Sequence, residues 1–160
     1  MAGLKVKGLN RTGVLACALA GLVVLAAPVA LAMPKYRNQA VVQFHYDEGN
    51  PLWEYDRRVM ACTYCHVQDT GGAPWNPFGE ALRAAFRADA EAGRHSKFPQ
   101  ILASVLESGS DADGDGYSDA LEVFAHTLPG DPESKPERSV DEVRSAFEAA
   151  GGMGLYLPGK

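Results

Sequence analysis

The segment Cys62-Thr63-Tyr64-Cys65-His66 constrains this chain more than any other feature. Two thiols three residues apart lie on one side of a helical turn, where both can form thioether bonds to the vinyl groups of one porphyrin. The histidine that follows can supply an axial nitrogen to the iron. The spacing therefore predicts one covalently bound haem c, with Cys62 and Cys65 as its anchors and His66 as its proximal ligand.

These residues resemble the haem-attachment motif of the c-type cytochromes, and the resemblance at this point covers the five residues alone. Three other uses of a CxxC pair stay open. A redox disulfide of the thioredoxin type is disfavoured because no strand–helix–strand pattern flanks the motif. Half of a zinc site is disfavoured because no second Cys/His pair follows at a suitable spacing. A structural disulfide leaves the adjacent histidine unexplained.

The N-terminus has the pattern of an export signal. Three cations, Lys5, Lys7 and Arg11, precede an apolar run over residues 14–31, and a small-x-small cleavage sequence ends at Ala32. This pattern predicts export to the periplasm or the cell envelope. Export also supports the haem prediction, because covalent haem attachment in bacteria is completed outside the cytoplasm.

Cleavage would remove residues 1–32 as a signal peptide and leave residues 33–160 as a single domain. An uncleaved membrane anchor is the alternative, because the apolar run reaches about 18 residues, the lower limit for spanning a bilayer. Cys17 is interpreted as a residue of the signal peptide. Cys62 and Cys65 would then be the thiols of the mature chain.

The predicted mature chain is acidic. Removing residues 1–32 leaves 12 Lys and Arg against 20 Asp and Glu, a net charge of −8. Without a basic patch we expect no nucleic-acid partner. An acidic surface suits a basic redox partner protein that docks transiently and is released by salt.

Hydrophobic periodicity predicts a mainly α fold. Asn76 is an N-cap followed by proline at the first helical position, and Ser139 opens a capping box. Residues 40–45 suggest one short strand. The expected helices cover residues 51–67, 76–93, 98–107 and 139–150.

A second motif fills every ligand position of a twelve-residue calcium loop over residues 111–122. Carboxylates fall at loop positions 1, 3, 5, 9 and 12, and a glycine stands at position 6, where the chain turns sharply. Calcium takes about 6–8 oxygen ligands, and carboxylates this close repel one another without a cation. The predicted Ca²⁺ ligands are Asp111, Asp113, Asp115, the backbone carbonyl of Tyr117, Asp119 and Glu122.

The loop resembles an EF-hand loop, and more closely the calcium repeats of secreted bacterial proteins related to thrombospondin type 3 repeats. Those repeats lead into a short helix and a proline-containing turn, here residues 121–124 and 128–132. A calcium sensor would need a methionine-rich face, which this region lacks, so the ion is expected to be structural. An acidic turn without an ion is the alternative.

Together the two motifs resemble a group of small exported bacterial proteins that pair one haem-attachment site with a DxDGDG calcium repeat. In that group a Gly-rich stretch and an N-x-F-G-like segment often follow the haem motif, here at residues 71–72 and 76–79. The resemblance covers about residues 53–136. It implies a small helical cytochrome c-like domain with an EF-hand-like calcium loop, whose haem-attachment part covers about residues 50–95.

The sequence leaves the sixth ligand of the iron open. Met153 lies in a glycine-rich segment near the C-terminus, and His95 lies just past the second expected helix. A methionine ligand favours the reduced iron and a high potential, whereas a second histidine usually gives a lower one. An open position would instead admit peroxide or a diatomic gas.

We therefore predict an exported monohaem c-type cytochrome that carries single electrons and is not an enzyme. One alternative is a haem enzyme or sensor with an open sixth position. Another is a haem- and calcium-stabilised subunit of a larger membrane or cell-envelope complex. Residues 33–50 and the tail after Gly151 have little expected core of their own and are candidate docking arms.

Overall fold

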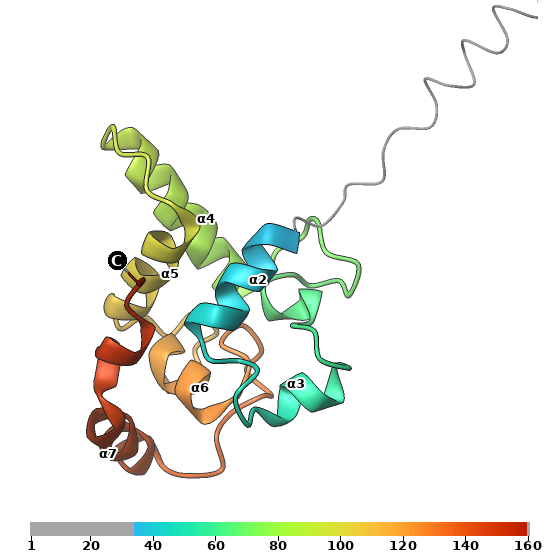
Figure 1. Ribbon diagram of the computed structural model, residues 1–160, viewed down its shortest axis with the longest axis vertical. Coiled ribbons are helices and arrows are strands. Elements are labelled where there is room, and N and C mark those ends of the chain that lie inside the picture. Colours follow the sequence, from blue (N-terminus) through green and yellow to red (C-terminus); the bar gives the residue numbers. More distant parts are fainter. Residues whose placement is uncertain (1–33, 160) are drawn as a thin grey trace, which may run out of the picture. The chain divides into compact units, whose positions relative to one another are not determined.

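The computed structural model describes residues 34–159, so the predicted signal peptide lies outside the described residues (Figure 1). Their elements are α2 (Pro34–Gln43), α3 (Pro51–Tyr55), the 3₁₀ turn η1 (Cys62–Tyr64), α4 (Pro77–Glu91), α5 (Phe98–Glu107), α6 (Asp119–Ala125), α7 (Val140–Ala150) and the 3₁₀ turn η2 (Gly152–Tyr156). The only β pairing in this part of the chain is an isolated bridge between His66 and Trp75. The prediction of a mainly α fold is confirmed. None of the described helices is long and apolar enough to cross a bilayer.

Helix α5 forms the centre of the core. It contacts α2, α4, α6 and η2 (Figure 1). Full burial of one large aliphatic or aromatic side chain stabilises a fold by about 1.5–3 kcal/mol, so this helix is a main source of stability. Its buried residues are Phe98, Ile101, Leu102, Ala103, Val105 and Leu106.

The two predicted caps begin their helices as expected. Asn76 Oδ1 accepts a hydrogen bond from the backbone N–H of Gly79 at 2.8 Å, which caps α4. At α7, the backbone N–H of Ser139 donates to Glu142 Oε2 at 2.9 Å, and Ser139 Oγ accepts from the backbone N–H of Glu142 in return. Each cap of this kind contributes about 1 kcal/mol, which explains why the sequence located these two helices well.

The single helix predicted over residues 51–67 is wrong. Helix α3 ends at Tyr55, and the chain then turns through Arg57 and Arg58, whose φ angles are 60° and 64°. The backbone N–H of Arg58 donates to Trp53 O at 2.7 Å, a bond that closes the helix end. Glycine usually occupies such left-handed positions, so two arginines gave no signal of the break.

The strand predicted over residues 40–45 is also wrong. This stretch is the end of α2 followed by a turn, and the backbone N–H of Phe44 donates to Ala40 O at 2.9 Å. Ala40 and Phe44 are both buried, four residues apart on one helical face, and Tyr46 is buried just after them. This burial outweighs the preference of the β-branched Val41 and Val42 for a strand.

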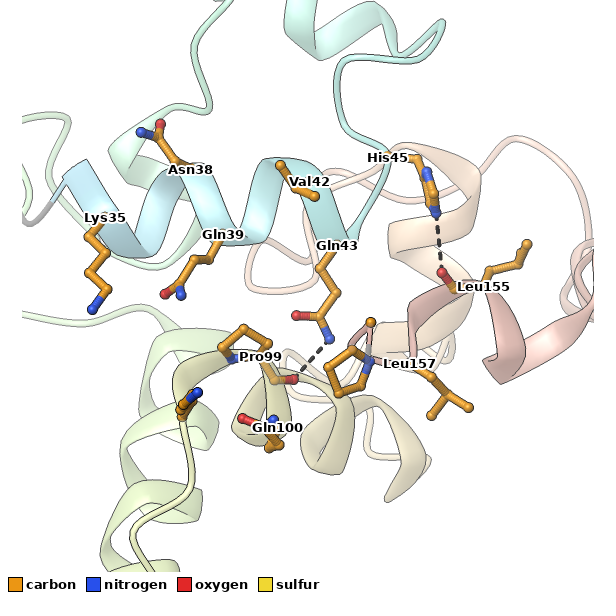
Figure 2. A pocket seen from close by; sticks show the side chains of 13 residues that line it. Lys35, Asn38, Gln39, Val42, Gln43, His45, Pro99, Gln100, Leu155 and Leu157 are labelled. Atoms are coloured by element: carbon orange, nitrogen blue, oxygen red, sulfur yellow. Dashed lines mark hydrogen bonds between the residues drawn. The ribbon is translucent and has the colours of Figure 1, made fainter.

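Residues 34–50 and the C-terminal tail pack onto the core, contrary to the expectation that they have little core of their own. Gln43 Nε2 donates to Pro99 O at 2.9 Å and to Tyr156 O at 2.8 Å, which joins α2, α5 and the tail. His45 Nε2 donates to Leu155 O at 3.2 Å. Figure 2 shows these side chains around a groove of about 670 Å³ between α2, α5 and the tail.

Candidate functional site

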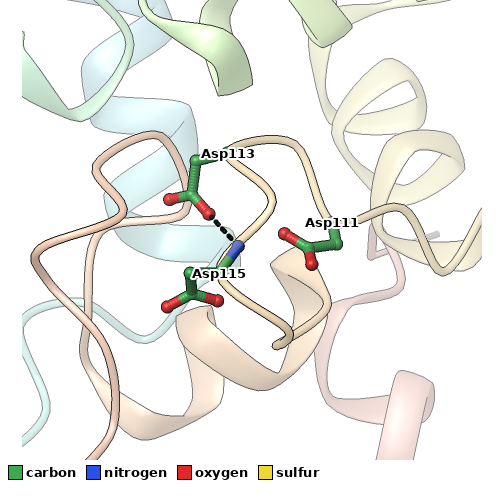
Figure 3. A group of neighbouring side chains, drawn as sticks. All are labelled: Asp111, Asp113 and Asp115. Carbon is green, nitrogen blue, oxygen red and sulfur yellow. Dashed lines mark hydrogen bonds between the residues drawn. The ribbon is translucent and has the colours of Figure 1, made fainter.

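The predicted calcium loop joins α5 to α6, so it is the loop of a helix–loop–helix unit. Three of its carboxylates gather at one point (Figure 3): one oxygen each from Asp111, Asp113 and Asp115 lie within 4.8 Å of one another. Among residues 34–159 this is the only group of three or more His, Cys, Asp or Glu side chains with that spacing. The structure thus brings together the first three predicted ligands.

Backbone N–H groups shape the loop around these carboxylates. The two oxygens of Asp111 accept from Gly114 N at 2.7 Å and from Gly116 N at 2.8 Å. Asp115 Oδ1 accepts from Tyr117 N at 2.9 Å. Gly116 has φ = 101°, a backbone conformation that residues with a side chain rarely adopt. This explains the glycine at loop position 6.

Glu122 reaches the loop from α6 and is fully buried. Both of its carboxyl oxygens lack a hydrogen-bond partner. Burial and, after it, the nearby carboxylates of the loop together raise the pKa of this carboxyl to about 9. A buried carboxylate without a partner is costly, so this side chain requires either a proton or a cation.

Asp119 is also fully buried but is already hydrogen-bonded within the protein. Its Oδ2 accepts from Ser110 Oγ at 2.7 Å and its Oδ1 accepts from the backbone N–H of Ala112 at 2.8 Å. Burial raises the pKa of Asp119 to about 6, although these two hydrogen bonds act in the opposite direction. Asp119 therefore ties the end of the loop to its beginning through Ser110 and Ala112. In calcium loops the residue at this position often binds the ion through a water molecule.

The loop is chemically suited to a hard divalent cation. Four buried carboxylate oxygens lack a partner: Asp113 Oδ2, Asp115 Oδ2 and both oxygens of Glu122. Buried polar atoms are nearly always paired, so four such oxygens in one twelve-residue loop call for an explanation. A calcium ion would supply it, because it binds several carboxylate oxygens at once.

The predicted haem-attachment motif occupies η1 and the two residues after it. His66 Nδ1 lies 2.6 Å from the carbonyl oxygen of Gly72. A carbonyl oxygen can only accept, so Nδ1 is the donor in this bond and Nε2 is the nitrogen left for a metal. Histidines that bind a metal commonly use this arrangement, in which the second nitrogen is held by a backbone carbonyl.

The chain folds back on itself after the motif and holds the histidine ring from a second side. The backbone N–H of Val67 donates to Pro74 O at 3.0 Å. The ring of Trp75 lies against that of His66, with the two centroids 4.0 Å apart and the planes inclined by 35°. The proximal ligand predicted from the sequence is thus oriented by Gly72 and Trp75, two residues whose roles the motif itself did not reveal.

Both motif thiols are free and partly buried, so the structure does not join them in a disulfide. Burial and, after it, the neighbouring Cys62 together raise the pKa of the Cys65 thiol to about 12. Arg37 Nη1 lies 3.9 Å from Cys62 Sγ. The two thiols therefore differ: Cys65 is held as a neutral thiol, while Cys62 faces a cation.

Apolar side chains close to the motif in sequence are left exposed. Tyr55, Val59 and Val67 are among the large apolar residues of the described chain that face solvent, and Tyr55 is 85 % exposed. A haem is a large apolar group and would cover surface of this kind. Together with the free thiols and the available Nε2 of His66, these residues fit a haem attached at the motif.

The two candidates for the sixth ligand lie in other elements than His66. His95 is exposed in the turn after α4, whose 15 residues span about 22 Å from the end that contacts the motif. Met153 packs partly buried against the core in η2, which contacts α7 and α5. In Figure 1 this red turn lies away from the green segment that carries the motif.

Comparison with protein-family models, with curated proteins and with solved structures finds no match for this chain.

Proposed function

We propose that this protein is an exported monohaem c-type cytochrome that carries single electrons and contains a structural calcium site. The observation that carries the proposal is the arrangement of His66, whose Nδ1 proton is held by Gly72 while Nε2 remains available. Cys62 and Cys65 would anchor the haem through thioether bonds. The haem would supply the redox chemistry, and the protein would orient it and limit its contact with water.

Electron transfer asks little of the protein beyond a rigid site near the surface. The backbone around His66 is held by hydrogen bonds from Val67 and Asn76, and the ring is held by Gly72 and Trp75. An acidic predicted mature chain supports transient docking to a basic redox partner. These features favour a carrier whose haem edge is accessible and whose proximal ligand does not move.

A haem enzyme or sensor with an open sixth position is the second candidate. The observation that favours it is that His95 is exposed after the far end of α4 and that Met153 packs against the core in η2. An open position would bind cyanide or carbon monoxide rapidly. A carrier with two strong axial ligands would bind these molecules slowly or not at all.

Calcium would act as a staple between α5 and α6. It would neutralise the repulsion among the loop carboxylates and satisfy the unpartnered oxygens of Glu122. An affinity as weak as about 10⁻⁴–10⁻³ M is enough for extracellular modules, where calcium is abundant. The staple fixes the path of the chain from the end of α5 to the start of α6.

Optical spectra of the oxidised and reduced protein, produced in a host that matures cytochromes c, test the haem proposal. The proposal predicts the sharp reduced bands of a c-type haem. A low-spin oxidised spectrum supports the carrier, and a methionine-to-iron charge-transfer band would identify a methionine ligand. A high-spin spectrum with rapid cyanide binding would replace the carrier by the enzyme or sensor. The absence of any haem absorption would contradict both.

A further inference from the structure

Asn76 holds the backbone of the haem-attachment motif as well as the start of α4. Its side chain is only 6 % exposed. Asn76 Nδ2 donates to Thr63 O at 2.9 Å, and its backbone N–H donates to Cys65 O at 3.2 Å. Its Oδ1 accepts the hydrogen bond from Gly79 N that caps α4. Two carbonyl groups of the motif are therefore positioned by one buried residue.

Helix α4 also rests directly on the motif through Gly79. A Cβ atom at this position would overlap the backbone carbonyl of Cys65 and would lie 2.9 Å from a ring carbon of Trp75. No flexible side chain is available on the Cys65 side to give way, because the obstacle there is backbone. Movement of the first turn of α4 would therefore displace the motif.

The other side of Asn76 rests on the turn that follows α6. Gly130 is buried in this turn, and a Cβ atom there would lie only 2.6 Å from Cγ and Nδ2 of Asn76. The turn is also bonded to the calcium loop. The backbone N–H of Thr127 donates to the carbonyl oxygen of Glu122 at 2.9 Å, and Thr127 Oγ1 donates to the same oxygen at 3.4 Å. The chain of contacts therefore runs from Glu122, the last predicted ligand, through residues 127–130 to Asn76 and on to Thr63.

We propose that Asn76 and Gly130 couple calcium binding in residues 111–122 to the haem-attachment motif, so that calcium orders the motif backbone for haem attachment. This coupling rests on the proposed function of both sites. Without the ion, the repelling carboxylates loosen the loop and the turn that contacts it, and Asn76 loses its support. An ordered motif backbone in turn favours the calcium-bound conformation of the loop, so the chain with haem attached should bind calcium more tightly than the haem-free chain.

Hydrogen exchange on the haem-free full-length chain tests this coupling. The chain is produced in a host that does not mature cytochromes c, and exchange is followed across residues 62–79 with calcium and with chelator. Calcium binding is measured in parallel by calorimetry. We expect calcium to slow exchange of the Val67 and Asn76 amides by about tenfold, within the usual range for coupled sites. These amides donate to Pro74 O and Cys65 O, so they report the motif backbone directly.

Two variants interrupt the coupling without removing a calcium ligand. Gly130→Ala places a methyl group against Asn76. Asn76→Asp keeps an oxygen to cap α4 but removes the donor to Thr63. Both should still bind calcium, and both should lose the slowing of exchange. The matched controls are Gly154→Ala, where a Cβ would meet nothing within 4 Å, and Asn50→Asp, which alters the capping residue of α3.

The outcomes separate this inference from the function on which it rests. If calorimetry detects no calcium binding to the wild-type chain, the calcium site itself is refuted, and the coupling falls with it. If calcium binds but exchange across residues 62–79 does not change, the coupling alone is refuted. It is equally refuted if Asn76→Asp responds to calcium as the wild type does, and this variant decides the question should Gly130→Ala fail to fold.

Discussion

The proposed calcium loop and the proposed haem-attachment segment differ in how much of each site lies in consecutive residues. In the loop, residues 111–122 supply the carboxylates, the sharp turn and the buried glutamate, and the structure gathers the first three carboxylates at one point. The haem segment supplies two thiols and one histidine, but the groups that orient them come from residues 72–79. The two predicted candidates for the sixth ligand lie in other elements, His95 after α4 and Met153 in η2.

This difference follows from the size of the two proposed cofactors. A calcium ion is enclosed by oxygens within a few ångströms of its centre, so one short loop can provide most of its ligands. A haem presents two wide faces, and covering them requires side chains from several elements. A local motif therefore predicts how a haem is attached but leaves its opposite face undetermined.

Calcium removal should have the largest effect on stability. We expect chelator to lower the Tm by about 10 °C, because an ion at about a hundredfold its Kd contributes about 2.7 kcal/mol to the free energy of unfolding. Calorimetry with and without calcium measures the change. Asp113→Asn, which weakens the site, should reduce the response. An unchanged Tm in chelator would contradict the proposal that calcium stabilises the loop between α5 and α6.

Gly79→Ala should be the most disruptive substitution near the haem segment. Its Cβ would overlap the carbonyl of Cys65, so the first turn of α4 or the motif must shift. We expect a loss of about 1–3 kcal/mol in the free energy of unfolding, the usual cost of overpacking. Denaturant unfolding measures it. Gly154→Ala is the control, because a Cβ there meets nothing within 4 Å. Equal stability of the two variants would show that α4 does not rest on the motif.

The calcium-free protein should lose stability as the pH rises. Burial raises the pKa of Glu122 from 4.5 to about 9, so the folded chain binds this proton more tightly than the unfolded chain does. The contribution of this proton to the free energy of unfolding is complete below about pH 4.5 and is lost as the pH rises towards 9. The Tm in chelator should therefore fall across this window, and calcium should abolish the fall by replacing the proton.

Glu122→Gln makes the same pH effect testable by substitution. A neutral amide resembles the protonated acid, so in chelator this variant should be more stable than the wild type at pH 8, while its response to calcium is reduced. Glu107→Gln, at an exposed position on α5, is the control and should leave both properties unchanged. A Glu122→Gln variant less stable than wild type in chelator at pH 8 would contradict the assigned environment of Glu122.

Replacing Trp75 should have the smallest effect. Trp75→Leu keeps an apolar side chain but loses the ring that lies against His66. We expect a loss of about 0.5–1.5 kcal/mol, the usual contribution of an aromatic pair beyond its buried area. Trp75→Phe keeps a ring and should lose less. Equal stability of the two variants would show that the ring contact does not hold His66.

The helices with local signals were predictable from the sequence, because a cap such as Asn76 or Ser139 acts within one turn. The break after α3 was not, because two arginines occupy the left-handed conformation there. The spacing of the loop carboxylates was enough to predict them as calcium ligands. The hydrogen bond from Ser110 Oγ to Asp119 could be found only in the folded structure. The support that Gly72 gives His66 also carried no signal, because it comes from a backbone carbonyl.

The most direct test of the central claim is the intact mass of the protein after denaturation. The chain is produced in a host that matures cytochromes c, next to the double variant Cys62→Ser/Cys65→Ser. The account predicts that the wild-type chain carries the mass of one haem that denaturation does not release, and that the double variant carries none. A wild-type chain without that mass would contradict covalent haem attachment at this motif.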